Sequence, residues 1–138
     1  MKEHKSFSTH ERDRLLKAAR EVAKKAYAPY SKFKVGAAIL TEQGNIFTGC
    51  NVENASYGLT ICAERAAIFS AIAGEGGDKM KIRALAVLND RDLPCPPCGA
   101  CRQVIYELGA LAIVIYSGKR KLETKPASEL LPNGFKIC

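Results

Sequence analysis

The sequence predicts an α/β fold: a three-layer α-β-α sandwich in which helices cover both faces of a mixed five-stranded sheet. Two apolar runs, at 82–88 and 111–117, show no polar-apolar alternation, which is typical of strands buried on both faces. Helical patterns separate these strands and favour parallel pairing. An earlier pair of runs, 34–41 and 46–51, is joined by the short turn EQGN and predicts an antiparallel hairpin.

The first element is a helix that begins after Ser8. Ser8 and Glu11 fit a capping box, in which each side chain hydrogen-bonds the backbone of the other residue. Pro29 is expected to end this helix, since proline has no amide hydrogen for the next helical bond. Apolar residues recur at helical spacing between these points: Leu15, Ala19, Val22, Ala23 and Ala26.

The remaining elements alternate between helices and strands. An alanine-rich helix is predicted over 62–73, where the segment GEGG stops it, and another over 98–108, where Gly109 closes it. A short strand at 121–124 and a helical turn at 127–131 complete the order α-β-β-α-β-α-β-β with a terminal turn. No linker or repeat interrupts this order, so residues 1–138 are expected to form a single domain.

Composition and cysteine content restrict the class of protein. No segment approaches the roughly 20 apolar residues of a membrane-spanning helix, and the charged N-terminus does not resemble a signal peptide. A cytoplasmic protein is therefore expected, in which thiols stay reduced. Six cysteines in such a protein indicate metal binding or thiol chemistry rather than disulfides.

The formal net charge is +7, and much of the positive charge lies near the N-terminus. The simplest interpretation is a helix with a solvated basic face, and the alternative is attraction to phosphate or nucleic acid. No aromatic residue interleaves with the charges between Arg12 and Lys25, which argues against a nucleic-acid partner. The basic residues are Lys2, Lys5, Arg12, Arg14, Lys17, Arg20, Lys24 and Lys25.

Three cysteines stand at even spacing in the segment PCPPCGACRQ, 94–103. Cys95, Cys98 and Cys101 could belong to an iron–sulfur site, a redox pair, half of a zinc ribbon or part of a catalytic metal site. The iron–sulfur pattern needs a fourth cysteine where Ile105 stands. A zinc ribbon needs a second, separate C-x-x-C pair. A thioredoxin-like pair of Cys98 and Cys101 stays open as an alternative.

Cys62, Cys98 and Cys101 together would leave a fourth position on zinc, which is how catalytic zinc sites are built. Each lies at or near the start of a predicted helix, where partial positive charge favours thiolate. Glu64 follows closely enough to take a proton from water that the metal acidifies. Arg65 could offset the excess negative charge of three thiolates on Zn²⁺. The alternative for Glu64 and Arg65 is an ordinary surface pair.

The motifs CAE at 62–64 and PCGACRQ at 97–103 together resemble the cytidine deaminase family, in its short homotetrameric form. The resemblance extends to YSKFKVGAAI at 30–39, GCNVENASYGLTICAERAAI at 49–68 and ELLPNGF at 129–135. It implies a zinc-dependent enzyme that deaminates cytidine and 2′-deoxycytidine to uridine and 2′-deoxyuridine, with release of ammonia, in pyrimidine salvage.

The resemblance also implies the roles of the central residues. Cys62, Cys98 and Cys101 would bind one zinc ion per subunit, and Arg65 would balance the charge of their thiolates. Glu64 would be the catalytic proton shuttle, which protonates ring N3 and then carries a second proton to the leaving amino group.

Substrate contacts and assembly are implied in the same way. Asn51 and Glu53 would hold the ribose, although turn chemistry explains both without the resemblance. Phe135 would reach into a neighbouring subunit and stack on the base, so the sites would be shared within a homotetramer. Three further residues would line the pocket: Phe33, otherwise a core residue, Ala63, and Tyr57 near a subunit interface.

The chain departs from the family pattern at three places. Pro96 stands where the family commonly has serine, the tail after Phe135 is short, and Cys95 has no family role and is expected to be a loop thiol without function. Two alternative functions stay open. One is deamination of another cytosine-bearing substrate, either a blasticidin-type antibiotic or cytosine in nucleic acid, and the other is a non-enzymatic zinc-binding module. The complete NVENASYG stretch and the compact length favour a free nucleoside.

Overall fold

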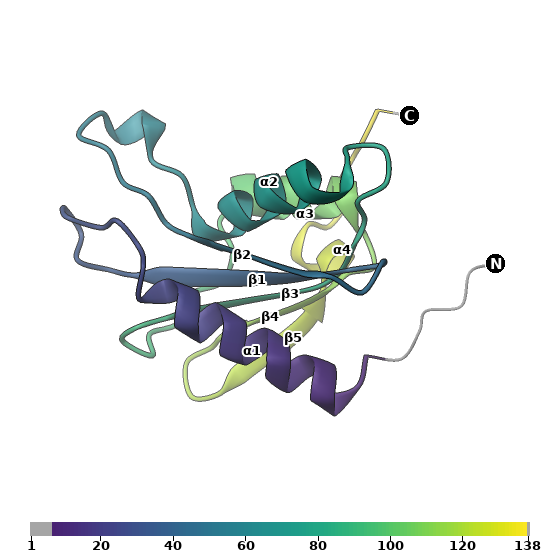
Figure 1. Cartoon of the computed structure of the whole chain (residues 1–138), viewed down its shortest axis with the longest axis horizontal. Coiled ribbons are helices and arrows are strands. Elements are labelled where there is room, and N and C mark those ends of the chain that lie inside the picture. The colour runs from purple at the N-terminus through teal and green to yellow at the C-terminus, as the bar shows by residue number, and fades with distance from the viewer. Residues whose placement is uncertain (1–6, 138) are drawn as a thin grey trace.

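The computed structural model describes residues 7–137 and has the expected order of helices and strands, with one short helix added (Figure 1). The added element is η1, Tyr57–Leu59, a single 3₁₀ turn that is too short to produce a periodic sequence pattern. The other elements are α1 (Thr9–Ala23), β1 (Val35–Thr41), β2 (Ile46–Cys50), α2 (Ala63–Glu75), β3 (Ile82–Asn89), α3 (Gly99–Leu108), β4 (Ile113–Ser117), β5 (Leu122–Pro126) and α4 (Ala127–Leu130).

The five strands form one mixed sheet in the order β2-β1-β3-β4-β5. β1 pairs antiparallel with β2, as the predicted hairpin, and antiparallel with β3 on its other side. β3 and β4, which α3 connects, pair in parallel, and β5 returns antiparallel to β4. The predicted mixed sheet is confirmed, and β3 is buried along its whole length, as its unbroken apolar run indicated.

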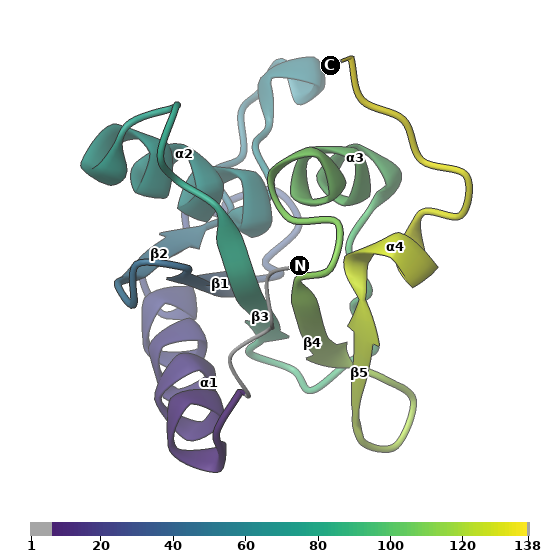
Figure 2. The ribbon, with the colours of Figure 1, turned by 90° about the vertical axis from the view of Figure 1, so that its right-hand side faces the viewer.

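Helices cover both faces of the sheet, which gives the predicted three layers (Figure 2). α1 packs on one face, where Leu15 contacts a cluster that includes Ala38 of β1. α2, α3 and α4 cover the other face, where Ile68 joins a cluster with Ile39 and Leu85. Because β2 and β3 both run antiparallel to β1, they end at the same edge of the sheet. The helices that follow them, α2 and α3, therefore begin close together.

Two glycines allow the helices to approach the sheet closely. A Cβ atom at Gly36 would overlap the backbone of Ala19 in α1, and a Cβ atom at Gly49 would overlap the backbone of Ala67 in α2. Glycine on the strands and alanine on the helices thus permit close packing of backbone on backbone.

The N-terminus of α1 has the predicted capping box. Ser8 Oγ accepts from the Glu11 amide and Glu11 Oε1 accepts from the Ser8 amide, both over 3.1 Å. The same carboxylate accepts two hydrogen bonds from the buried guanidinium of Arg83 in β3, over 3.0 and 3.2 Å. The cap therefore also attaches the helix to the sheet.

The end of α1 differs from the sequence expectation. The helix ends at Ala23 and does not continue to Pro29. The main chain of Tyr27 instead accepts from the Glu53 amide over 2.8 Å and donates to the Asn51 carbonyl over 3.0 Å. This pairing with a distant segment takes the chain out of the helix well before the proline.

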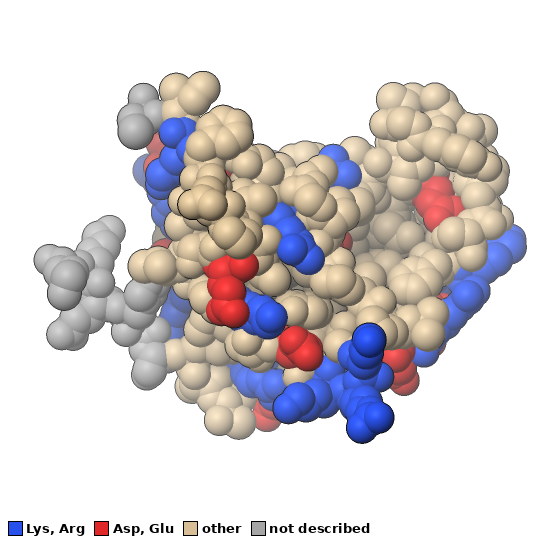
Figure 3. Space-filling view, turned by 180° about the vertical axis from the view of Figure 1, so that it is seen from behind, with Lys and Arg blue, Asp and Glu red and all other residues tan. Residues whose placement is uncertain are grey.

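Lysine and arginine side chains gather along the lower edge of the molecule in Figure 3, where Figure 1 places α1 and the turn between β4 and β5. Acidic Asp13 and Glu21 are also exposed on α1, as on a solvated helix face. Lys2 and Lys5 lie outside the described residues. No helix within residues 7–137 has the length and apolar character needed to cross a membrane. Exposed basic residues include Arg14, Lys17, Arg20, Lys119, Arg120 and Lys121.

Candidate functional site

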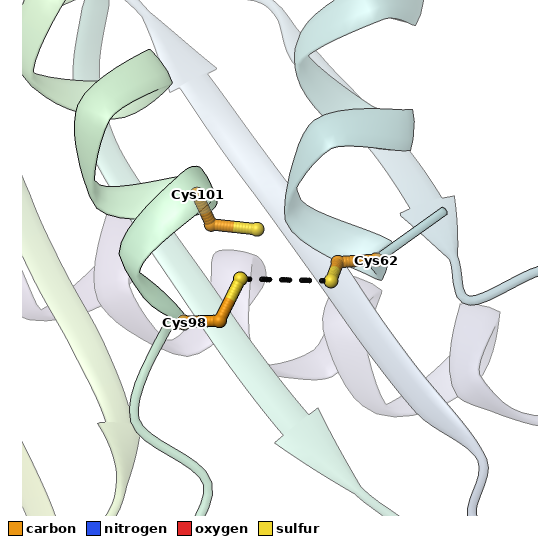
Figure 4. A group of neighbouring side chains, drawn as sticks. All are labelled: Cys62, Cys98 and Cys101. Carbon is orange, nitrogen blue, oxygen red and sulfur yellow. Dashed lines mark hydrogen bonds between the residues drawn. The ribbon is translucent and has the colours of Figure 1, made fainter. Parts of the chain in front are cut away.

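Three cysteines meet where α2 and α3 begin. Cys62 is the N-cap of α2, Cys98 is the N-cap of α3, and Cys101 lies in the first turn of α3. Their sulfur atoms all lie within 4.8 Å of one another, and those of Cys62 and Cys98 are 3.8 Å apart (Figure 4). Among residues 7–137, this group has the geometry to hold a metal ion.

Hydrogen bonds favour negative charge on this cluster. Arg65 donates from Nη2 to Cys62 Sγ over 3.4 Å. Hydrogen bonding from Cys101, and then from Arg65, lowers the pKa of Cys62 to about 5. The same interaction with Cys62 raises the pKa of Cys101, because the Cys101 thiol acts as the donor. These hydrogen bonds favour the thiolate form of Cys62, and a thiolate is the form that binds metal.

Glu64 is buried beside the cluster. Its side chain is only 5% exposed, and the preceding residue, Ala63, is fully buried at the start of α2. Burial raises the pKa of Glu64 to about 7, since removal from water disfavours the charged carboxylate. A carboxyl group with a pKa near neutrality can both give and take a proton at pH 7, which is what general acid–base catalysis requires.

Cys95 does not belong to this group of sulfur atoms. Its amide donates to the Ser117 carbonyl over 2.9 Å, and its half-buried side chain packs against the core. Burial, and then the nearby carboxylate of Glu64, raises the pKa of Cys95 to about 11. It is therefore a neutral thiol, and the evenly spaced cysteines occupy different environments.

The chain folds back on itself between Asn51 and Cys62. Val52 and Ile61 exchange two main-chain hydrogen bonds of 3.0 and 2.9 Å. Residues 51–61, here called the arm, thus leave the sheet after β2 and return directly to the start of α2 (Figure 1). The segment that carries the candidate ribose-binding residues is thus paired with the segment that leads into Cys62.

The side chain of Asn51 holds the loop that precedes β1. Its Oδ1 accepts from the Val35 amide and its Nδ2 donates to the Phe33 carbonyl, both over 2.8 Å. Phe33 is half-buried against the core, and the Arg91 guanidinium lies 6.0 Å from its ring centroid. Asn51 therefore positions Phe33 through its main chain.

Glu53 anchors the beginning of the same loop. Its Oε1 accepts from the amides of Tyr30 and Ser31 over 3.0 and 3.1 Å, and its Oε2 accepts from the Ser31 hydroxyl. Hydrogen bonding from Ser31 lowers the pKa of Glu53, so this carboxyl is ionised. A hollow of about 280 Å³ opens here, lined by Tyr30, Ser31, Glu53, Asn54, Tyr57 and Thr60.

The two aromatic residues expected near a subunit interface are both exposed. The side chain of Tyr57 is 77% exposed and meets the Tyr30 ring edge-on, with 6.3 Å between centroids. Phe135 is 68% exposed and belongs to the C-terminal segment, which Figure 1 places well away from the arm. Within one chain, the structure does not bring Phe135 together with Asn51 and Glu53.

Sequence reasoning missed two residues that follow Cys101. Arg102 donates to the Pro97 carbonyl over 2.7 Å and to the Leu130 carbonyl over 3.0 Å. Gln103 donates from Nε2 to the Phe135 carbonyl over 3.0 Å. Their place in the motif PCGACRQ was the available signal, but only the folded chain shows what they bind.

A larger hollow, of about 600 Å³, lies around Gly109 at the other end of α3. Its rim includes the exposed side chains of Lys79, Lys81 and Lys136. It contains none of the cysteines, so its size does not make it the reactive site.

An α-β-α sandwich with three cysteines and a buried carboxyl group at the start of two helices defines a candidate zinc hydrolase. The family model described as "Cytidine and deoxycytidylate deaminase zinc-binding region" matches residues 9–117. This chain therefore belongs to the cytidine and deoxycytidylate deaminase family.

Individual relatives agree with the family. The chain is 46% identical to cytidine deaminase from Halalkalibacterium halodurans, over 91% of this chain and 94% of the relative. It is 44% identical to cytidine deaminase from Sporosarcina psychrophila, over 89% and 90% of the two chains. A solved structure of cytidine deaminase from Burkholderia pseudomallei matches with a TM-score of 0.80 and 46% identity, over 93% of this chain and 99% of that chain.

Proposed function

We propose that this protein is a zinc-dependent cytidine deaminase, which converts cytidine and 2′-deoxycytidine to uridine and 2′-deoxyuridine and releases ammonia. The observation that carries the proposal is the group of Cys62, Cys98 and Cys101, with sulfur atoms within 4.8 Å, beside the buried Glu64. Relatives with 44 and 46% identity over most of the chain are named cytidine deaminases. A role in pyrimidine salvage follows from this reaction.

The three thiols fit Zn²⁺ as a donor set. Sulfur is a ligand that zinc prefers, and three protein ligands leave one tetrahedral position open. Bound zinc would supply a Lewis acid that makes water nucleophilic near neutral pH. Arg65, which donates to Cys62, would offset part of the negative charge of three thiolates.

Glu64 is the proposed proton carrier. As the oxygen of water adds to C4 of the base, Glu64 takes one proton from that water and gives it to ring N3. It then moves the remaining hydroxyl proton to the exocyclic nitrogen, the C4–N bond breaks, and ammonia leaves. The pKa of about 7 that burial gives Glu64 supports this double role.

Asn51 and Glu53 are the proposed ribose contacts. The Asn51 amide uses one acceptor position and one N–H on the loop before β1, and a primary amide has two of each. The Glu53 carboxylate accepts three hydrogen bonds and has about four lone-pair sites. The remaining capacity suits a hydroxyl group, while Phe33 and Ala63 would border the base.

The same proposal includes a homotetramer with shared sites. The arm exposes Val52, Tyr57 and Leu59, of which Tyr57 is 77% and Leu59 66% exposed. Figure 3 shows the arm as a projecting lobe with little charge, and exposed apolar surface of this kind is typical of interfaces. Because Phe135 lies far from the arm of its own chain, its contact with a nucleoside would require a neighbouring subunit.

The proposal treats residues 1–138 as one deaminase domain. Helix α2 precedes β3 in the chain and α3 follows it, and the starts of both helices supply thiols to one cluster. All five strands belong to one continuous sheet, and this arrangement supports a single domain. Free thiols suit the reducing cytoplasm, which is the proposed compartment.

The test is a substrate panel with zinc-loaded protein. Cytidine and 2′-deoxycytidine should each yield the uracil nucleoside and an equal amount of ammonia, measured by chromatography and an ammonia assay. Blasticidin S and a cytosine-containing single-stranded oligonucleotide are the competing substrates and should not react. No turnover of either nucleoside by protein that contains zinc would overturn the proposal. The solution mass should be about four times the chain mass of 15.0 kDa.

A further inference from the structure

Helix α3 is attached to the C-terminal segment by residues that directly follow its candidate metal ligands. Cys98 and Cys101 occupy the start of the helix. Arg102 then joins the helix to the Leu130 carbonyl over 3.0 Å, and Gln103 joins it to the Phe135 carbonyl over 3.0 Å. Two of the three clustered cysteines and the C-terminal segment are thus held by one helix.

The C-terminal segment reverses direction just before Phe135. Asn133 has a φ of 59°, and the Gly134 amide donates to the Leu131 carbonyl over 3.1 Å. A Cβ atom at Gly134 would lie 2.9 Å from Leu131 and 3.1 Å from the Tyr106 ring of α3, closer than ordinary van der Waals contact. This turn brings the main chain of Phe135 to the surface of α3, where the Gln103 amide binds it.

The Phe135 side chain has little packing of its own. It is 68% exposed, and Lys136 and Ile137 after it are exposed too. The described structure holds Phe135 through its main chain, at the carbonyl that Gln103 binds.

We infer that Gln103 is a positioning residue that sets where Phe135 projects, and thereby how Phe135 meets a nucleoside in a neighbouring subunit. The inference rests on the proposed function, in which Phe135 stacks on the base. Gln103 does not touch the substrate in this arrangement and acts through the tail. A single neutral hydrogen bond of this kind changes a binding equilibrium by about two- to tenfold.

The test combines a matched substitution with a double-mutant cycle. Gln103→Glu keeps the side-chain shape, removes the N–H donor and places a carboxylate against the Phe135 carbonyl. Gln103→Met removes the donor without adding charge and serves as the second variant. Glu107→Gln, at an exposed position of the same helix, is the control and should leave kcat and KM unchanged.

Both Gln103 variants should raise KM for cytidine about two- to tenfold, with kcat within about twofold and one zinc per chain. A higher KM with unchanged kcat is expected when a variant loses an interaction that stabilises the bound substrate and the transition state equally. In a Phe135→Ala background the same substitutions should add nothing to KM, because coupled residues are not additive. Hydrogen exchange of the segment 131–137 should also become faster in the Gln103 variants.

An unchanged KM in both variants, or a KM increase that persists in full without the Phe135 ring, would overturn the inference. If Phe135→Ala leaves KM unchanged, the stacking role fails and the inference fails with it. If wild-type protein does not deaminate cytidine, the proposed function fails, and the exchange rate of the segment 131–137 still decides whether Gln103 holds the tail.

Discussion

The Arg65 guanidinium donates to the Cys62 sulfur over 3.4 Å, from the first turn of α2 back to the N-cap of the same helix. This contact places a fixed positive charge against a sulfur that the site needs as thiolate. It also raises the pKa of Arg65, so the guanidinium stays charged throughout the working pH range.

Arg65→Ala should weaken deamination without removing zinc. A hydrogen bond to a charged group is worth about 1.5–3 kcal/mol, so kcat/KM should fall by roughly tenfold or more. Steady-state kinetics and metal analysis of the same preparation check this. Full activity in the variant would mean that Arg65 is only a surface residue.

The four cysteines near the site should separate into two groups on substitution. Cys62→Ser, Cys98→Ser and Cys101→Ser should each lose bound zinc and activity, since each removes one thiol from the group within 4.8 Å. Cys95→Ser should keep both, because its sulfur lies outside that group. Metal analysis after dialysis decides the matter, and loss of zinc in the Cys95 variant would contradict the assignment.

Glu64→Gln should keep zinc but lose activity. The amide has nearly the same shape, so the buried position remains filled, but it cannot exchange a proton. General acid–base catalysis contributes about 10²–10⁴-fold, and kcat should fall by at least that range because Glu64 serves two transfers. If the Glu64→Gln variant binds zinc and is as active as the wild-type protein, a different residue must carry the proton. If the wild-type protein and the Glu64→Gln variant both bind zinc and neither deaminates cytidine, the result would favour a non-enzymatic zinc-binding module.

Glu11→Gln should destabilise the fold with a defined pH dependence. Hydrogen bonding to the Ser8 amide, and then the charge of Arg83, lowers the pKa of Glu11 below its ordinary value of 4.5. Because the folded-state pKa is depressed, the stabilisation is complete above the unfolded-state pKa and is lost as pH falls through the folded-state pKa.

Urea unfolding measures this effect. At pH 7 the variant should lose about 1 kcal/mol of unfolding free energy, and the difference should shrink below pH 4.5. Glu21→Gln is the matched control, since the Glu21–Lys24 pair is exposed on both sides and should contribute little. Equal effects of the two substitutions, or a difference independent of pH, would contradict the assignment.

Local signals in the sequence were sufficient for most of the fold. The capping box of Ser8 and Glu11, the unbroken apolar run of β3 and Gly109 after α3 each act within a few residues, so the pattern alone locates the element. The end of α1 could not be predicted in this way. The helix ends at Ala23, and the main chain of Tyr27 pairs instead with the distant residues Asn51 and Glu53.

The sequence by itself determined the chemistry available to this protein: its thiols, the carboxyl group beside Cys62 and the strand-helix order that brings two helix starts together. Only the tertiary structure decided how those groups are used. It separates Cys95 from the other thiols, buries Glu64, and turns Gln103 toward Phe135. The physical reason is that burial and hydrogen-bond partners depend on segments far apart in the chain, and spacing along the sequence does not encode which of them will meet.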